Sequence, residues 1–219
     1  MSVPVPGVTD DEPAVTEGAG VETSGGEPTA QTAEAAESGA LARLDAFPWG
    51  TGVLVGAASF LVSYLLLVGW VFLGPASLPG STVEQLKRVG FLLYNAQGVL
   101  VVADTPPDVV ALPVDLLSRA TLPIVYRAVP AVVLFVASAA FARWRWVDGS
   151  DGVAVLATGA AVALGYLAVA LVGTYVFVIV QSGVPFHPDR IESFLFVTGY
   201  GLVFGLFGSM VARARGAPA

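Results

Sequence analysis

The sequence predicts an all-α membrane protein, built as a four-helix transmembrane bundle with a disordered acidic N-terminal tail and an outer loop that contains an amphipathic helix. Two observations lead to this prediction. Apolar residues gather in four long stretches that are separated mainly by short charged segments. The N-terminal segment, by contrast, has the polar and acidic composition of a chain that cannot form a packed core.

The four apolar stretches have the length that a transmembrane helix needs. About 20 residues of α-helix cross a hydrocarbon core of about 30 Å. We therefore expect spans at residues 50–73, 122–142, 152–180 and 191–212, within a membrane domain of residues 47–215. A short polar turn joins the second and third spans, so we expect these two helices to pack as antiparallel neighbours.

Residues 1–46 are expected to form a disordered tail in the cytoplasm. They carry nine acidic side chains and one basic residue, Arg43. Such a segment cannot bury enough apolar surface to offset the entropy lost on ordering. It also lacks the basic start and apolar middle of a signal peptide, so we expect it to be retained. The alternative is that its acidic cluster at residues 10–12 docks a cationic partner.

The longest connection, residues 74–121, is expected to face the outside of the cell. Ser81 and Glu84 have the spacing of a capping box, apolar residues recur at helical spacing after them, and Gly98 is expected to end this helix. We also expect Glu84 and Arg88 to form an ion pair. The helix either lies on the membrane, caps the bundle or, because its second half is uncharged, enters the bilayer as a fifth span.

Basic residues near the span ends predict the orientation. With an even number of spans, five of them fall on one side: Arg43, Arg143, Arg145, Arg213 and Arg215. The positive-inside rule makes that side cytoplasmic. The other side also carries five basic residues, but Lys87 and Arg88 lie deep in the loop and Arg127 lies within a span. We expect a multi-pass protein of the cell membrane with both termini in the cytoplasm.

Several function classes lack the residues that they need. The chain has no Cys and one histidine, His187, so we expect no disulfide, no metal site and no cofactor. It has no Gly-x-Ser-x-Gly, His-Glu-x-x-His or phosphate-loop motif, so we expect no catalytic residues and no enzyme. No basic stripe is present, and the longest cytoplasmic segment is acidic, so we expect no nucleic-acid partner.

Composition and one short segment suggest a source. The chain has seventeen acidic and ten basic residues, with one Lys beside nine Arg, which suits the surface of a protein in a salt-saturated cytoplasm. Together with the acidic tail and the four spans, the segment Phe-Leu-Leu-Tyr-Asn-Ala at residues 91–96 resembles a haloarchaeal family of uncharacterised multi-pass membrane proteins. The resemblance implies this source and architecture. It implies no assigned activity, although some members carry a loose transporter label.

Arg127 is the first candidate site residue. It lies inside the second span, where a charged side chain is costly and a long one reaches back toward the interface. It either extends to the outer headgroups, faces an anion in a cavity, or forms an outer-leaflet ion pair that holds the loop onto the bundle. The acids available for such a pair are Asp115, Glu192 and Asp104.

Small residues at four-residue spacing are the second set of candidates. They are Gly52 and Gly56 in the first span, Ala157, Ala161 and Gly165 in the third, and Gly201 and Gly205 in the fourth. This spacing lets helix backbones approach closely in a membrane. We expect it to serve packing within the chain. The alternative is a homodimer through Gly201, Gly205 and Ser209.

These features leave two functions open. No Asp, Glu, Lys or His lies near the middle of a span, so the carboxylate of many proton-coupled carriers is missing. We expect a structural, accessory or scaffold component of the cell membrane. The alternative is a small oligomeric channel or carrier whose polar path uses span hydroxyls such as Ser63, Tyr166 and Tyr200. The expected partners are the lipid bilayer and either another membrane protein or a second copy of the chain.

Overall fold

The computed structural model describes residues 38–39, 41–42, 44–74, 78–105, 113–116, 125–145 and 152–216. Most of the tail predicted for residues 1–46 lies outside these ranges, as do the turn predicted between the second and third spans and the first residues of the predicted second span. Arg43 and the acidic cluster at residues 10–12 also lie outside them.

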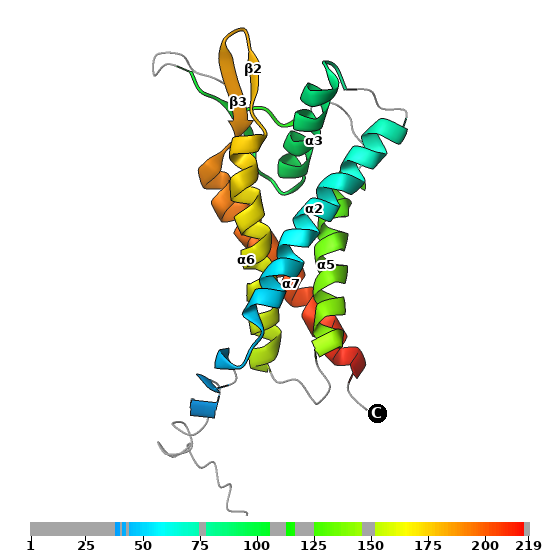
Figure 1. Ribbon diagram of the computed structural model, residues 1–219, viewed down its shortest axis with the longest axis vertical. Coiled ribbons are helices and arrows are strands. Elements are labelled where there is room, and N and C mark those ends of the chain that lie inside the picture. Colours follow the sequence, from blue (N-terminus) through cyan, green and yellow to red (C-terminus); the bar gives the residue numbers. More distant parts are fainter. Residues whose placement is uncertain are drawn as a thin grey trace, which may run out of the picture. The chain divides into compact units, whose positions relative to one another are not determined.

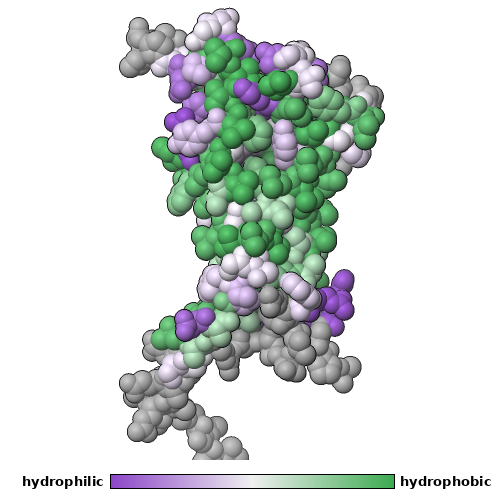
Figure 2. Space-filling view, viewed as in Figure 1, coloured by the Kyte–Doolittle hydropathy of each residue, from purple (hydrophilic) through white to green (hydrophobic). Residues whose placement is uncertain are grey.

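Four long helices make up the body of the described chain: α2 (Trp49–Leu73), α5 (Val125–Arg145), α6 (Gly152–Val176) and α7 (Arg190–Gly216). Each contains a stretch long and apolar enough to cross a membrane. Figure 2 shows hydrophobic side chains covering the middle of the bundle and hydrophilic ones toward its two ends, most of them at the upper end. A bilayer suits this surface, because so much exposed apolar area is rare on a soluble protein. The four-helix membrane fold class is confirmed.

The four helices form a ring in which α2 and α7 each pack against both α5 and α6. Figure 1 shows α2 and α7 running obliquely to the other two helices. The prediction that the second and third spans are neighbours is wrong, because α5 and α6 make few contacts with each other. A short connection limits how far apart two helix ends can be. It does not decide which faces pack together.

Small residues bring α2 and α6 together. Gly52, Gly56 and Gly165 are buried, and none has room for a side chain. An added carbon at Gly56 would overlap the backbone carbonyl of Val162, and one at Gly165 would overlap that of Val53. Backbone contact of this kind takes the place of the hydrophobic effect, which does not drive helices together inside lipid. The two helices are therefore matched to each other at several points along their length.

The candidate packing residues of α7 also make their contacts within the chain. Gly201 lies against Ala163 of α6, and an added carbon at Gly205 would lie 3.2 Å from the carbonyl oxygen of Gly159. The Ser209 hydroxyl is buried and donates to backbone oxygens, among them that of Gly205 at 3.0 Å. The face considered for a homodimer is thus in contact with α6.

A small cap closes one end of the bundle (Figure 1). We define the cap as α3 (Thr82–Ala96), β1 (Val101–Ala103), β2 (Ile179–Gln181), β3 (Val184–Pro188) and the short segment 113–116. The strands pair antiparallel in the order β1-β3-β2. The third span was expected to continue to residue 180. Helix α6 instead ends at Val176, because the β-branched residues that follow form β2.

A two-residue turn joins β2 to β3. Gln181 pairs with Val184, so that Ser182 and Gly183 form the loop. Both loop residues have positive φ, 51° for Ser182 and 82° for Gly183. Positive φ at both central residues is the geometry of a type I′ turn, whose twist matches that of the flanking strands. This turn holds the edge strand β2 beside the end of α6.

The hydrophobic core is continuous from the bundle into the cap. Phe60 and Tyr166 are buried between α2 and α6, and their rings meet edge to face at 5.2 Å. Tyr94 of α3 meets Phe60 in the same way at 6.0 Å. Because aromatic rings fill the junction, the cap is packed onto the bundle as part of one core.

Candidate functional site

Local sequence fixes where α3 begins and ends. The Ser81 hydroxyl accepts from the Glu84 backbone N–H at 3.4 Å, and the Glu84 carboxylate accepts from the Ser81 N–H at 2.9 Å. Gly98, with a φ of 88°, follows the last turn, so both predicted ends of this helix are confirmed. The predicted ion pair between Glu84 and Arg88 does not form, because the capping box holds the Glu84 carboxylate at the other end of the turn.

The second half of α3 is buried on every side, from Val89 to Asn95. The Tyr94 hydroxyl donates to the Ala170 carbonyl of α6, and the Gln97 amide donates to the Tyr166 hydroxyl at 3.0 Å. Burial raises the pKa of the Tyr94 hydroxyl, which keeps it a donor. Of the arrangements expected for this helix, the structure has the one in which it caps the bundle.

Polar groups of α3 also hold the neighbouring segments in place. The Asn95 side chain accepts from the Leu116 N–H at 2.9 Å and donates to the Val99 carbonyl at 2.7 Å. The Lys87 ammonium donates to the Val178 carbonyl at 2.7 Å, between α6 and β2. These bonds connect α3 to the segment 113–116, to the residues between α3 and β1, and to the residues between α6 and β2, so they fix the position of α3 relative to these segments.

The structure brings Arg127 together with Asp115. Their side chains approach to 3.8 Å between Arg127 Nη2 and Asp115 Oδ2, at the junction of α5 and the cap. The other two acids considered for Arg127 have different partners. Glu192 accepts from the Leu100 N–H at 2.8 Å, and Asp104 lies 3.0 Å from His187 Nε2.

His187 lies on β3, next to β1, and its side chain is buried. Its Nδ1 is 2.9 Å from the carbonyl oxygen of Pro188, and its Nε2 faces the Asp104 carboxylate. Both ring nitrogens therefore face oxygen atoms that accept hydrogen bonds. This pair joins the ends of two strands. Among the described residues, no group of three or more His, Asp or Glu side chains is placed to hold a metal ion.

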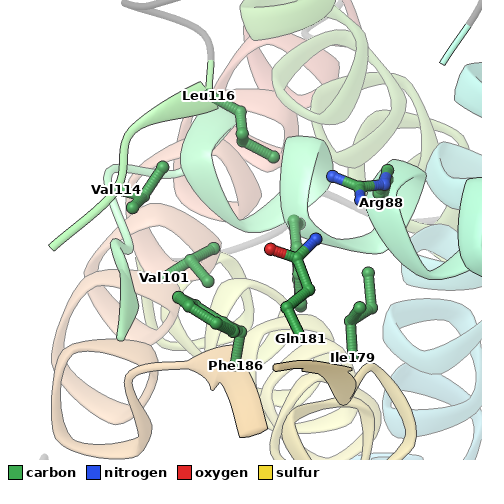
Figure 3. A pocket seen from close by; sticks show the side chains of 8 residues that line it. Arg88, Val101, Val114, Leu116, Ile179, Gln181 and Phe186 are labelled. Carbon is green, nitrogen blue, oxygen red and sulfur yellow. The ribbon is translucent and has the colours of Figure 1, made fainter. Parts of the chain in front are cut away.

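Arg88 is the functional candidate that sequence reasoning missed. It lines a pocket of about 80 Å³ inside the cap, and its Nε is buried without a hydrogen-bond partner. Figure 3 shows its guanidinium and the Gln181 amide projecting into the same space. The lining residues are Arg88, Phe91, Val101, Val114, Leu116, Ile179, Gln181 and Phe186. We call this space the Arg88 pocket. Its wall is mostly apolar and contains one cationic side chain, that of Arg88.

The sequence contained evidence that Arg88 would not pair with Glu84. Glu84 has the third helical position after Ser81, where a carboxylate turns back to the N-cap, so it was not available to Arg88. The acidic residues of the described cap serve as helix caps or in the pairs and bonds given above, and Asp189 caps α7 by accepting from the Ile191 N–H at 2.8 Å. Arg88 is left with no acidic partner among the residues that the structure describes.

Comparison with known families gives a match over most of the chain. A model described as a family of unknown function (DUF7978) matches residues 28–216. These residues include every helix and strand named above. No curated protein and no solved structure matches the chain.

Proposed function

Because the chain belongs to a family of unknown function, DUF7978, we propose its role from its architecture: a structural, accessory or scaffold component of the cell membrane that acts through contacts made by its cap. Four apolar helices support the membrane location. The filled interior of the bundle is the observation that carries the proposal. Large side chains such as Leu67, Leu134 and Val197 have no exposed surface, so they leave little room for a solute between the helices.

Several hydroxyl groups that could line a polar path donate to backbone carbonyls instead. The Ser63 hydroxyl donates to the Ser59 carbonyl at 2.7 Å, and the Tyr64 hydroxyl donates to the Leu86 carbonyl at 3.2 Å. Tyr200 donates to the Arg127 carbonyl at 3.4 Å. Groups used in this way stabilise helix contacts, as polar residues commonly do in membrane proteins.

A channel or carrier with a path between subunits is the second candidate. A lateral groove of about 420 Å³ lies between α2 and α5 and is a place where another helix or a lipid chain could lie. Its lining is almost entirely Val and Ala, and its one hydroxyl, that of Ser59, donates to the Val55 carbonyl at 2.7 Å. An apolar groove favours packing over conduction, which supports the first candidate.

We also propose that the chain is not an enzyme, since its one histidine contacts Asp104 and Pro188.

The proposed orientation places the cap outside the cell and the C-terminus in the cytoplasm. The end of α5, the start of α6 and the end of α7 lie at the end of the bundle away from the cap (Figure 1). Arg143, Arg145, Arg213 and Arg215 belong to that end. The positive-inside rule then makes it cytoplasmic. An acidic, Lys-poor composition supports a haloarchaeal source, so experiments belong in high salt.

Site-specific photocrosslinking in the native host tests this proposal. A photoreactive residue replaces Val83, which is 62% exposed on the cap, or Leu164, which is 54% exposed on the middle of α6. We expect Val83 to give a protein adduct of one defined mass and Leu164 to give lipid adducts. Solute flux through liposomes that contain only this chain, with a self-adduct from Leu164 and none from Val83, would overturn the proposal in favour of the channel or carrier.

A further inference from the structure

The Arg88 pocket combines one cationic side chain with a mostly apolar wall, and we propose that it binds a small organic anion: a carboxylate that carries a short apolar chain. Neither the family nor the proposed membrane role assigns a ligand to this place. The inference rests on three properties of the pocket, which are its unbalanced charge, the direction of its polar groups, and its volume and lining.

The Arg88 guanidinium needs a hydrogen-bond acceptor. Its Nε is buried and makes no hydrogen bond, and leaving such a donor without a partner is costly. The nearest candidate in sequence, Glu84, is held by the capping box. Lys87, the neighbouring cation, is already bonded to the Val178 carbonyl. A ligand with one negative charge therefore matches the site, whereas a dianion would have a second charge without a cationic partner among the described lining residues.

The polar groups converge on one point. Figure 3 shows the Arg88 guanidinium entering from α3 and the Gln181 amide entering from β2 toward the same space. A guanidinium presents parallel N–H groups that fit the two oxygens of a carboxylate. The Gln181 amide can donate to the same oxygens. Because the two side chains come from segments far apart in sequence, folding of the cap builds the site.

The rest of the lining favours the apolar part of a ligand. Phe91, Val101, Val114 and Phe186 present apolar surface, and none of the described residues that line the pocket is acidic. The volume of about 80 Å³ equals that of roughly three water molecules at about 30 Å³ each, which is room for a carboxylate and a few carbon atoms. Gln181 is exposed, so a longer chain can leave the pocket beside it.

Two sources can supply this chemistry: a free short-chain carboxylic acid or the head of a membrane fatty acid. The experiment uses the full-length protein in nanodiscs at constant high salt. Butyrate labelled with ¹³C at its carboxyl carbon is titrated and followed by NMR. Butylamine is the ligand of opposite charge. Lipid extracts of the purified proteins, analysed by mass spectrometry, separate the two sources.

Arg88→Gln is compared with Arg213→Gln, which removes the same charge from an exposed position on α7. We expect saturable butyrate binding to the wild type and to Arg213→Gln, with binding to Arg88→Gln weaker by about tenfold or more. Butylamine should not bind saturably. The lipid is the source if the wild type retains fatty acid, Arg88→Gln does not, and butyrate binds only after delipidation. The free acid is the source if butyrate binds without delipidation.

Val114→Phe provides a second variant that keeps Arg88 and fills the pocket. It should also abolish binding, and thermal unfolding checks that each variant is folded. Equal butyrate binding by the wild type, Arg88→Gln and Val114→Phe would overturn the proposal. So would the absence of both saturable butyrate binding and retained fatty acid in the wild type.

Discussion

The backbone carbonyl of Val162 on α6 lies against Gly56 on α2 so closely that no side-chain carbon fits between them. We predict that Gly56→Ala separates the two helices and lowers the free energy of unfolding by about 1–3 kcal/mol or more, because overpacking displaces backbone that cannot move easily. Denaturant titration in detergent, followed by circular dichroism, measures this change.

Gly69 provides the matched control on the same helix. An added carbon there meets nothing within 4 Å. Gly69→Ala should therefore leave stability within about 1 kcal/mol of the wild type, in the stabilising direction that alanine gives a helix. Equal destabilisation by both substitutions would mean that the contact with Val162 does not explain the effect, because alanine by itself favours a helix over glycine.

A second prediction concerns the bond that ties α3 to α6. Tyr94→Phe removes the hydroxyl that donates to the Ala170 carbonyl and should cost about 1 kcal/mol. Tyr175→Phe removes a hydroxyl from a side chain that is 66% exposed and should cost less. Hydrogen exchange provides the local readout: amides of α3 should exchange faster in Tyr94→Phe and not in Tyr175→Phe. Unchanged protection of α3 in both variants would contradict the anchoring role.

The Tyr94 hydroxyl also predicts a pH dependence. Burial raises the pKa of this group in the folded chain above the value of about 10 that it has when unfolded. The stability associated with the neutral hydroxyl is therefore fully present below pH of about 10 and is lost as the pH rises further. The decline in wild-type stability above that pH should be smaller in Tyr94→Phe, which has no proton to lose. Parallel declines would count against this assignment.

The bundle could be predicted from sequence because its signals are local. Apolar stretches give the four helices, and the capping box with Gly98 gives the bounds of α3. Helix neighbours could not be predicted, because they depend on which glycine meets which carbonyl across the bundle. The pairing of Gly56 with Val162 involves residues more than a hundred positions apart.

The small sheet and the Arg88 pocket were missed for a related reason. Residues 177–180 are apolar, and periodicity alone does not separate a short apolar strand from the end of an apolar helix. The pair Ser182-Gly183, which lies between Ile179-Val180-Gln181 and Val184, was the available hairpin signal. The pocket needs β1, β2, β3 and α3 together, and β1 pairs with a strand far along the chain. Without knowledge of that pairing, the sequence gives no reason to place the lining residues around one pocket.

The turn between β2 and β3 gives a further prediction. Gly183 has a φ of 82°, a conformation that L-residues adopt at a cost of about 1–2 kcal/mol. Gly183→Val should destabilise the hairpin by that amount or more. Ser182→Asn, in the same turn, should stabilise it by a few tenths of a kcal/mol, because Asn favours positive φ. Exchange rates of the β3 amides report both effects. Wild-type rates in Gly183→Val would contradict the turn geometry.

The pair of Arg127 and Asp115 gives another prediction, measured by a double-mutant cycle with Arg127→Leu and Asp115→Asn. The Arg127 side chain is 54% exposed and that of Asp115 is 27% exposed, at a separation of 3.8 Å. An exposed pair at this distance should couple by about 0.2–1 kcal/mol. The cycle is needed because Asp115 has further interactions that a single substitution would also remove. Zero coupling would mean that Arg127 only extends toward the headgroups.

The orientation of the bundle gives the last prediction. The chain has no cysteine, so a single introduced thiol reports its own position. Val180→Cys places the thiol on the cap, where the native side chain is 62% exposed, and Ala214→Cys places it on the exposed end of α7. A membrane-impermeant maleimide should label Val180→Cys in intact cells and Ala214→Cys only after lysis, because the proposed orientation, based on the positive-inside rule, places the arginines near residue 214 in the cytoplasm. The opposite labelling pattern would place the cap, and with it the Arg88 pocket, inside the cell.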